Sequence, residues 1–64
     1  MSDDYHFAAA RHNKIIDLIE KNHSVKLGEL RALFDISETT IRRDLAALEG
    51  RGVLTRTYGG AHNP

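Results

Sequence analysis

The chain has 64 residues, with nine Lys or Arg against nine Asp or Glu and no cysteine. This length allows one small domain, and the lack of cysteine excludes both a disulfide framework and a thiolate zinc site. No apolar stretch approaches the roughly 18 residues of a membrane span, and the start lacks the basic and apolar regions of a signal peptide. We therefore expect a soluble, cytoplasmic protein with no membrane partner. The formal net charge of zero is unlike the basic balance expected of a nucleic-acid binder.

The first elements in chain order are a loose N-terminal arm and a helix. Residues 1–7 carry two acids and no helical periodicity, and we expect Tyr5 or Phe7 to fold back onto the body of the domain. From residue 8 onward, one set of side chains recurs at spacings of three and four, which predicts an amphipathic helix over about residues 8–22. The stripe of this helix consists of Arg11, Ile15, Leu18, Ile19 and Asn22.

A second, shorter helix is predicted after a turn at residues 22–24 and a single extended residue, Val25. Helical spacing of apolar residues resumes at Leu27 but lasts for only about eight residues, as far as Phe34. We therefore expect a short helix that ends before residues 35–37.

The third helix has a clear start signal. Ser37 is a good N-cap, and Glu38 places a negative charge at the positive end of the helix. The helix is predicted to run from Glu38 to about Glu49, with Gly50 or Gly52 supplying a left-handed residue at its end. On a helical wheel the core face holds Ile41, Leu45 and Leu48, and the opposite face and flanks hold Thr39, Thr40, Arg42, Arg43, Ala46, Ala47 and Gly50.

The residue types beyond the third helix are those of a strand. Residues 53–58 are rich in β-branched and aromatic side chains, and Gly59 and Gly60 then form a turn. A second strand should follow Ala61, although little chain is left to build it. Two helices joined by a tight turn and followed by a hairpin predict a three-helix winged helix-turn-helix. This fold is mainly α with a small β-hairpin and spans residues 8–63, with the helix-turn-helix motif at about 25–44 and the wing at about 53–63.

The exposed side of the third helix combines short side chains with arginines. Short hydroxyls and methyl groups let a helix lie close in a DNA groove, and Arg42 and Arg43 could reach phosphate or the O6 and N7 acceptors of guanine. In residues 51–64 there are two arginines, two adjacent glycines and no acid, so the backbone of the wing can approach a phosphate or a narrow groove. The alternatives are a solvated helix face and an ordinary hairpin turn.

Asp44 is the odd member of the third helix, because a carboxylate near the groove-facing side would repel phosphate. We expect it to orient either Arg51 or Arg56 through a charge-assisted hydrogen bond. The four histidines form no i, i+4 pair, so no metal site is predicted. The sequence also lacks a catalytic triad, a phosphate loop and a carboxylate pair, which predicts no enzyme activity, no cofactor and no small-molecule site in this chain.

Two motifs in the second half of the chain are specific in their residues and spacing. They are Ser37-x-x-Thr40-Ile41-Arg42-Arg43-Asp44-Leu45 and Arg56-x-x-Gly59-Gly60-Ala61. Together with further matches at Arg11-His12-Asn13, Ile15-Ile16, Val25, Glu29-Leu30, Phe34, Ile36 and Leu48-Glu49, they resemble the DeoR family of bacterial transcriptional regulators. The likeness covers nearly the whole chain after the arm.

The resemblance implies a domain that binds a double-stranded DNA operator, usually within a repressor of carbohydrate uptake or catabolism genes. It also implies a C-terminal domain, absent from this chain, that binds a sugar-phosphate-type effector and forms homo-oligomers. We expect the isolated domain to be a monomer. The second helix would offer its first amides, near Lys26 and Gly28, to a phosphate. The residues expected to contact DNA are Lys26, Ser37, Thr39, Thr40, Arg42, Arg43, Arg56, Tyr58, Gly59 and Gly60.

Three positions depart from the family pattern. Asp35 stands where many helix-turn-helix proteins have Gly, which Asp tolerates because its side chain can bond locally in a left-handed conformation. Arg31 occupies a position that is often Ala, and Tyr58 stands where the family often has His.

The alternative from a different functional class is a winged helix used for protein contact, and an RNA-binding winged helix is a third. Because the net charge is zero, we expect weak nonspecific DNA binding, with specificity resting on a few arginines.

Overall fold

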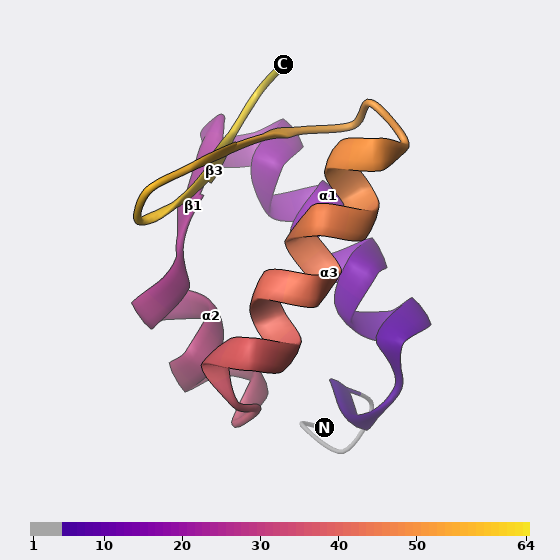
Figure 1. Cartoon of the computed structure of the whole chain (residues 1–64), viewed down its shortest axis with the longest axis vertical. Coiled ribbons are helices and arrows are strands. Elements are labelled where there is room, and N and C mark those ends of the chain that lie inside the picture. The colour runs from indigo at the N-terminus through magenta and orange to yellow at the C-terminus, as the bar shows by residue number, and fades with distance from the viewer. Residues whose placement is uncertain (1–4) are drawn as a thin grey trace.

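The computed structural model describes residues 5–64, which form three helices and three short strands (Figure 1). In chain order the elements are α1 (Ala8–Asn22), β1 (Ser24–Lys26), α2 (Leu27–Phe34), α3 (Glu38–Gly50), β2 (Thr55–Thr57) and β3 (Gly60–His62). This is the predicted winged helix-turn-helix, with β2 and β3 as its wing. Within residues 5–64, none of the helices combines the length and apolar character needed to cross a membrane.

The ends of α3 follow local signals in the sequence. The Ser37 hydroxyl accepts the Thr40 amide hydrogen at an N–O distance of 3.3 Å, which confirms the predicted N-cap. Of the two glycines proposed for the other end, Gly52 is the left-handed one, with φ of 79°. Its amide bonds to the Glu49 carbonyl at 2.9 Å, so the chain turns sharply from the helix into the wing.

The tight turn between α2 and α3 depends on Asp35. This residue is left-handed, with φ of 56°, and its amide bonds to the carbonyl of Arg31 at 2.9 Å. The expected left-handed conformation of Asp35 at this turn is confirmed. His23 ends α1 in the same way, with φ of 72°, although the sequence analysis predicted only a turn there.

The strands form one antiparallel sheet in the order β1-β3-β2. Ala61 in the central strand faces Val25 on one side and Arg56 on the other. The sequence predicts a single extended residue at Val25, but Ser24–Lys26 form a strand because β3 supplies a partner along all three residues. The second wing strand also forms in full pairing with both neighbours, although the prediction left little chain for it.

One apolar core joins the helices to the sheet. Tyr5 packs its ring against Phe34 with centroids 4.7 Å apart, whereas Phe7 is 69% exposed, so Tyr5 is the aromatic residue that folds back. Residues 1–4 of the predicted arm lie outside the described residues. The core consists of Ile15, Ile19, Val25, Leu27, Leu30, Phe34, Ile41, Leu45, Leu48, Leu54 and Ala61.

Candidate nucleic-acid interface

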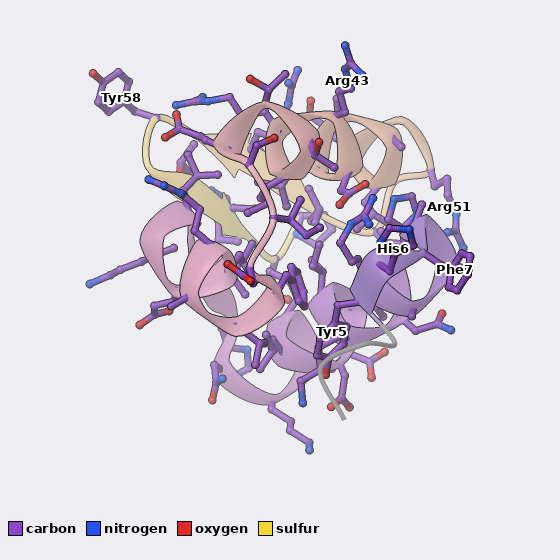
Figure 2. All side chains as sticks on the ribbon, turned by 90° about the horizontal axis from the view of Figure 1, so that it is seen from below. Tyr5, His6, Phe7, Arg43, Arg51 and Tyr58 are labelled. Atoms are coloured by element: carbon purple, nitrogen blue, oxygen red, sulfur yellow. The ribbon has the colours of Figure 1, made fainter. Side chains whose placement is uncertain are left out.

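α3 presents one face to the core and the other to solvent. Ile41, Leu45 and Leu48 are buried, as the helical wheel predicts. Figure 2 shows Arg43 projecting from α3 on the same side of the molecule as Tyr58 at the tip of the wing. The exposed residues on the outer side of α3 are Thr39, Arg42, Arg43, Ala47 and Gly50, while Thr40 and Ala46 are half-buried.

The hydroxyls at the start of α3 are bonded to each other. Ser37 Oγ donates to Thr40 Oγ1 at 3.1 Å while it also accepts the Thr40 amide hydrogen. Both hydroxyls therefore serve the helix cap in the free protein. Thr39 is exposed beside them, and within residues 5–64 its side chain forms no hydrogen bond.

The three arginines predicted to contact DNA differ in their partners. Arg42 pairs with Glu38 one turn earlier, with its Nε and Nη2 at 2.8 and 2.7 Å from one carboxylate oxygen. Arg56 of the wing donates its Nε to Glu49 at 2.9 Å. Arg43 forms no ion pair with any residue from Tyr5 to Pro64, so its guanidinium is the one that no carboxylate neutralises.

The tip of the wing joins the start of α2. Tyr58 is 98% exposed, and the carbonyl of the neighbouring Gly59 accepts the Leu27 amide hydrogen at 2.9 Å. Lys26 is exposed and pairs with Gly60 across β1 and β3. The structure therefore places Lys26 beside the wing, although the two are far apart in the sequence.

Gly60 has a packing role that the sequence analysis did not assign. It is buried in the sheet, and a Cβ at this position would overlap the carbonyl oxygen of Val25. Only glycine lets β1 and β3 approach this closely. Gly59 is exposed with open space around it, so of the two glycines it is the one that is accessible to a ligand.

Glu49 bridges α3 and the wing. Its Oε2 accepts the backbone amide hydrogen of Arg56 and its Oε1 accepts Nε of the same residue, both at 2.9 Å. The hydrogen bond from the Arg56 amide has the largest effect on the pKa of the Glu49 carboxyl, and the bond from the Arg56 side chain has the next largest. Both lower this pKa below its usual value, so the carboxyl is ionised at neutral pH. The bridge borders a cleft of about 260 Å³ lined by Leu27, Arg42, Leu45, Glu49, Arg56, Thr57 and Gly60.

The predicted partner of Asp44 was wrong. Asp44 is only 4% exposed, and it pairs with Arg11 of α1 through Nε at 2.5 Å and Nη2 at 3.1 Å, not with Arg51 or Arg56. The reason is that Asp44 turns inward toward α1, while Arg56 is held by Glu49. The hydrogen bond to Asp44 raises the pKa of Arg11 against the opposing effect of burial.

The pair has further partners at the N-terminal end of α1. His12 Nε2 lies 3.1 Å from Asp44 Oδ1, and Arg11 Nη1 donates to the carbonyls of Tyr5 and His6 at 3.0 Å each. Asp44 thus fixes α1 and the segment before it to the inner side of α3. This places a buried ionic contact one residue from the exposed Arg43.

The carboxylate partners of Arg42 and Arg56 were not predicted from the sequence. The Glu38–Arg42 spacing of i, i+4 is a signal that could have found the first pair. The Glu49–Arg56 pair has no such signal, because its geometry depends on how the chain turns at Gly52.

Comparison with known proteins places this architecture among bacterial regulators. The family model of the DeoR-like helix-turn-helix domain matches residues 11–64. The uncharacterized HTH-type transcriptional regulator FruR of Bacillus subtilis is 59% identical over 51 residues, which cover 80% of this chain and 20% of the relative. The HTH-type transcriptional regulator GolR of Listeria innocua is 44% identical over 55 residues, 86% of this chain and 22% of the relative.

A third relative is a lactose phosphotransferase system repressor of Lactococcus lactis, 47% identical over 51 residues. The match covers 80% of this chain and 20% of that repressor. This chain therefore spans about a fifth of the length of these three relatives, all of which are named as transcriptional regulators or repressors. No solved structure matched the chain.

Proposed function

The chain belongs to the DeoR-like helix-turn-helix family, and we propose that it binds double-stranded DNA with α3 in the major groove and the wing against the adjacent backbone or minor groove. The observation that carries the proposal is the common side shared by the outer face of α3 and the wing tip, from which Arg43 and Tyr58 project (Figure 2). A groove-reading helix and a backbone-contacting wing must face the DNA together.

The ion-pair partners of the three arginines suggest which part of the DNA each arginine contacts. Arg43, with no carboxylate partner within residues 5–64, can offer a whole guanidinium edge to O6 and N7 of a guanine. Arg56 keeps both terminal nitrogens for phosphate, because Glu49 holds only its Nε. Arg42 keeps Nη1 for phosphate, because Glu38 holds its Nε and Nη2. Lys26, beside the wing at the start of α2, adds a phosphate contact that carries no sequence information.

The regulated genes are inferred from the relatives. GolR is named as a transcriptional regulator, and the Lactococcus protein as a lactose phosphotransferase system repressor. We extend this class of role to the present chain as the operator-binding domain of a repressor of carbohydrate-metabolism genes. The family match supports DNA binding more directly than it supports the identity of the regulated genes, because the match lies within the helix-turn-helix residues.

The proposal is tested by selecting binding sites from a random pool of DNA duplexes with the 64-residue protein. We expect a short enriched sequence with guanine at one or more fixed positions. The enriched duplex is then titrated by fluorescence anisotropy beside a scrambled duplex and an RNA duplex of the same sequence. Preference for the enriched DNA over both competitors supports DNA reading.

Other outcomes of this titration would contradict the proposal. Equal affinity for enriched and scrambled DNA would remove sequence reading, and tighter binding to the RNA duplex would favour an RNA-binding winged helix. Absence of binding to any duplex, even at low salt where phosphate contacts are strongest, would favour a winged helix used for protein contact.

A further inference from the structure

Resting on the proposed DNA binding, we propose that Glu49 is a positioning residue that fixes the wing to α3 and so sets the preference for operator over other DNA. Nothing in the family match or in the names of the relatives assigns a role to this carboxylate. Its two bonds to Arg56 join the last turn of α3 to the first wing strand.

The geometry of the contact is that of a two-point clamp. One oxygen of Glu49 holds the backbone of Arg56 and the other holds its side chain, each at 2.9 Å. Two bonds from one planar carboxylate fix both the position of the strand and the direction of the guanidinium.

The position of β2 in the sheet explains why the clamp matters. β2 is an edge strand in the order β1-β3-β2, so no further strand is available to pair with its outer side. The Arg56 amide bonds to the Glu49 carboxylate, which takes the place of that strand. Within residues 5–64, no other side-chain hydrogen bond or ion pair joins α3 to β2 or β3.

The clamp also sets the spacing of two cations across the interface. Arg42 on α3 and Arg56 on the wing both line the cleft of about 260 Å³ that Glu49 borders. The side chains of Arg56 and Glu49 are 48% and 36% exposed, so the pair is open to a ligand on one side. Holding Arg56 in place before binding lowers the conformational entropy that is lost when DNA is contacted, but only for DNA whose backbone fits the preset spacing.

The experiment uses two variants of Glu49 and a matched control. Glu49→Ala removes both bonds, whereas Glu49→Gln keeps an oxygen that can accept the Arg56 amide hydrogen and removes the ion pair. Glu20→Ala on α1 is the control, because it removes the same charge from an exposed helical position that forms no ion pair within residues 5–64. Affinities are measured by anisotropy for the selected duplex and for a scrambled duplex.

We expect Glu49→Ala to lower the ratio of selected to scrambled affinity about tenfold, mostly through weaker binding to the selected duplex. Glu49→Gln should lie between the wild type and Glu49→Ala, and Glu20→Ala should leave the ratio unchanged. A readout without DNA is amide hydrogen exchange by NMR. The Arg56 amide should exchange at least about tenfold faster in Glu49→Ala, while amides within α1 keep their protection and show that the domain is folded.

The inference is overturned if Glu49→Ala keeps the wild-type ratio, if Glu20→Ala lowers it equally, or if exchange of the Arg56 amide does not change. Failure of the proposed function has a different signature. A wild-type protein that prefers no selected duplex would overturn both the DNA reading and the specificity role of Glu49. A wild type that does prefer its selected duplex, with an unchanged ratio in Glu49→Ala, would overturn the role of Glu49 alone.

Discussion

Arg43 and Lys26 are both exposed cations of the candidate interface, but they stand in different places. Arg43 projects from the outer face of α3, and Lys26 lies at the junction of β1 and α2 beside the wing. A helix in the major groove meets base edges, whereas the start of the preceding helix meets the backbone. Truncation of the two side chains should therefore change DNA affinity in different ways.

We expect Arg43→Ala to weaken binding to the selected duplex by about 1–3 kcal/mol and to relax the base preference at one position. Lys26→Ala should weaken binding to selected and scrambled duplexes by the same factor, because phosphate is present in both. The measurement is a titration of each variant against the selected duplex, its single-base variants and a scrambled duplex. Equal losses for Arg43→Ala on selected and scrambled DNA would exclude base reading by this arginine.

Asp44 acts on stability through a buried ionic contact. Arg11 and Asp44 are 6% and 4% exposed, and every buried polar side-chain atom within residues 5–64 has a hydrogen-bond partner. Removal of one member of such a pair leaves a buried charge without its counterion, which costs more than the pair itself contributes. A domain of this size has a free energy of unfolding of only about 3–10 kcal/mol.

Asp44→Ala should therefore lower the free energy of unfolding by about 3–5 kcal/mol, a large fraction of that total. The matched control is Asp17→Ala, because Asp17 pairs with Lys21 at 3.3 Å on the exposed side of α1. That change should cost less than about 1 kcal/mol. Urea unfolding followed by circular dichroism measures both, and a comparably small loss in both variants would contradict the role given to the buried pair.

The position of Asp44 on α3 was predictable, but its partner was not. A helical wheel places the residue between the core and the outer face, and it carries no information on which other helix lies behind it. The pairing with Arg11 joins residues 33 apart in sequence and depends on how α1 packs on α3. Arg11 was already placed in the stripe of the first helix, so only the combination of the two helices identifies the pair.

At the scale of elements, periodicity and capping predicted the helices, while the strands depended on tertiary contacts. The three helices follow apolar spacing, and Ser37 and Asp35 mark the ends of the turn between the last two. β1 has only three residues, too few to show an alternating pattern, and it exists because β3 pairs with it. No local signal in residues 24–26 could have revealed that partner.

Gly60 shows how the sheet constrains a wing residue. We expect Gly60→Ala to lower the free energy of unfolding by about 1–3 kcal/mol or more, because the new methyl group would meet the backbone oxygen of Val25, which cannot move without separating β1 from β3. Gly59→Ala is the control, since nothing lies within 4 Å of a Cβ there and its φ is not positive. Thermal unfolding of both variants tests this, and equal melting temperatures would show that the strands adjust without cost.

At the scale of the whole molecule, acidic and basic residues are equal in number, and acidic residues also pair with the arginines of the candidate interface. Glu38 and Glu49 lie on α3 itself and each neutralises one of the arginines expected to contact phosphate. The clustering of arginines after residue 38 therefore gives a smaller positive field than a count of arginines suggests. Long-range attraction to DNA should be weak, and contact geometry must supply most of the discrimination.

The dependence of binding on salt measures this balance. If Lys26, Arg42 and Arg56 are the phosphate contacts of one domain, the logarithm of affinity should fall against the logarithm of salt with a slope of about −2.7, a loss of about 40-fold between 50 and 200 mM KCl. Lys26→Ala should reduce the size of the slope by about one. Titrations of the selected duplex at several KCl concentrations give both values. A loss of about a thousandfold or more over the same range would require six or more neutralised phosphates, and it would mean that residues beyond these three cations dominate the contact.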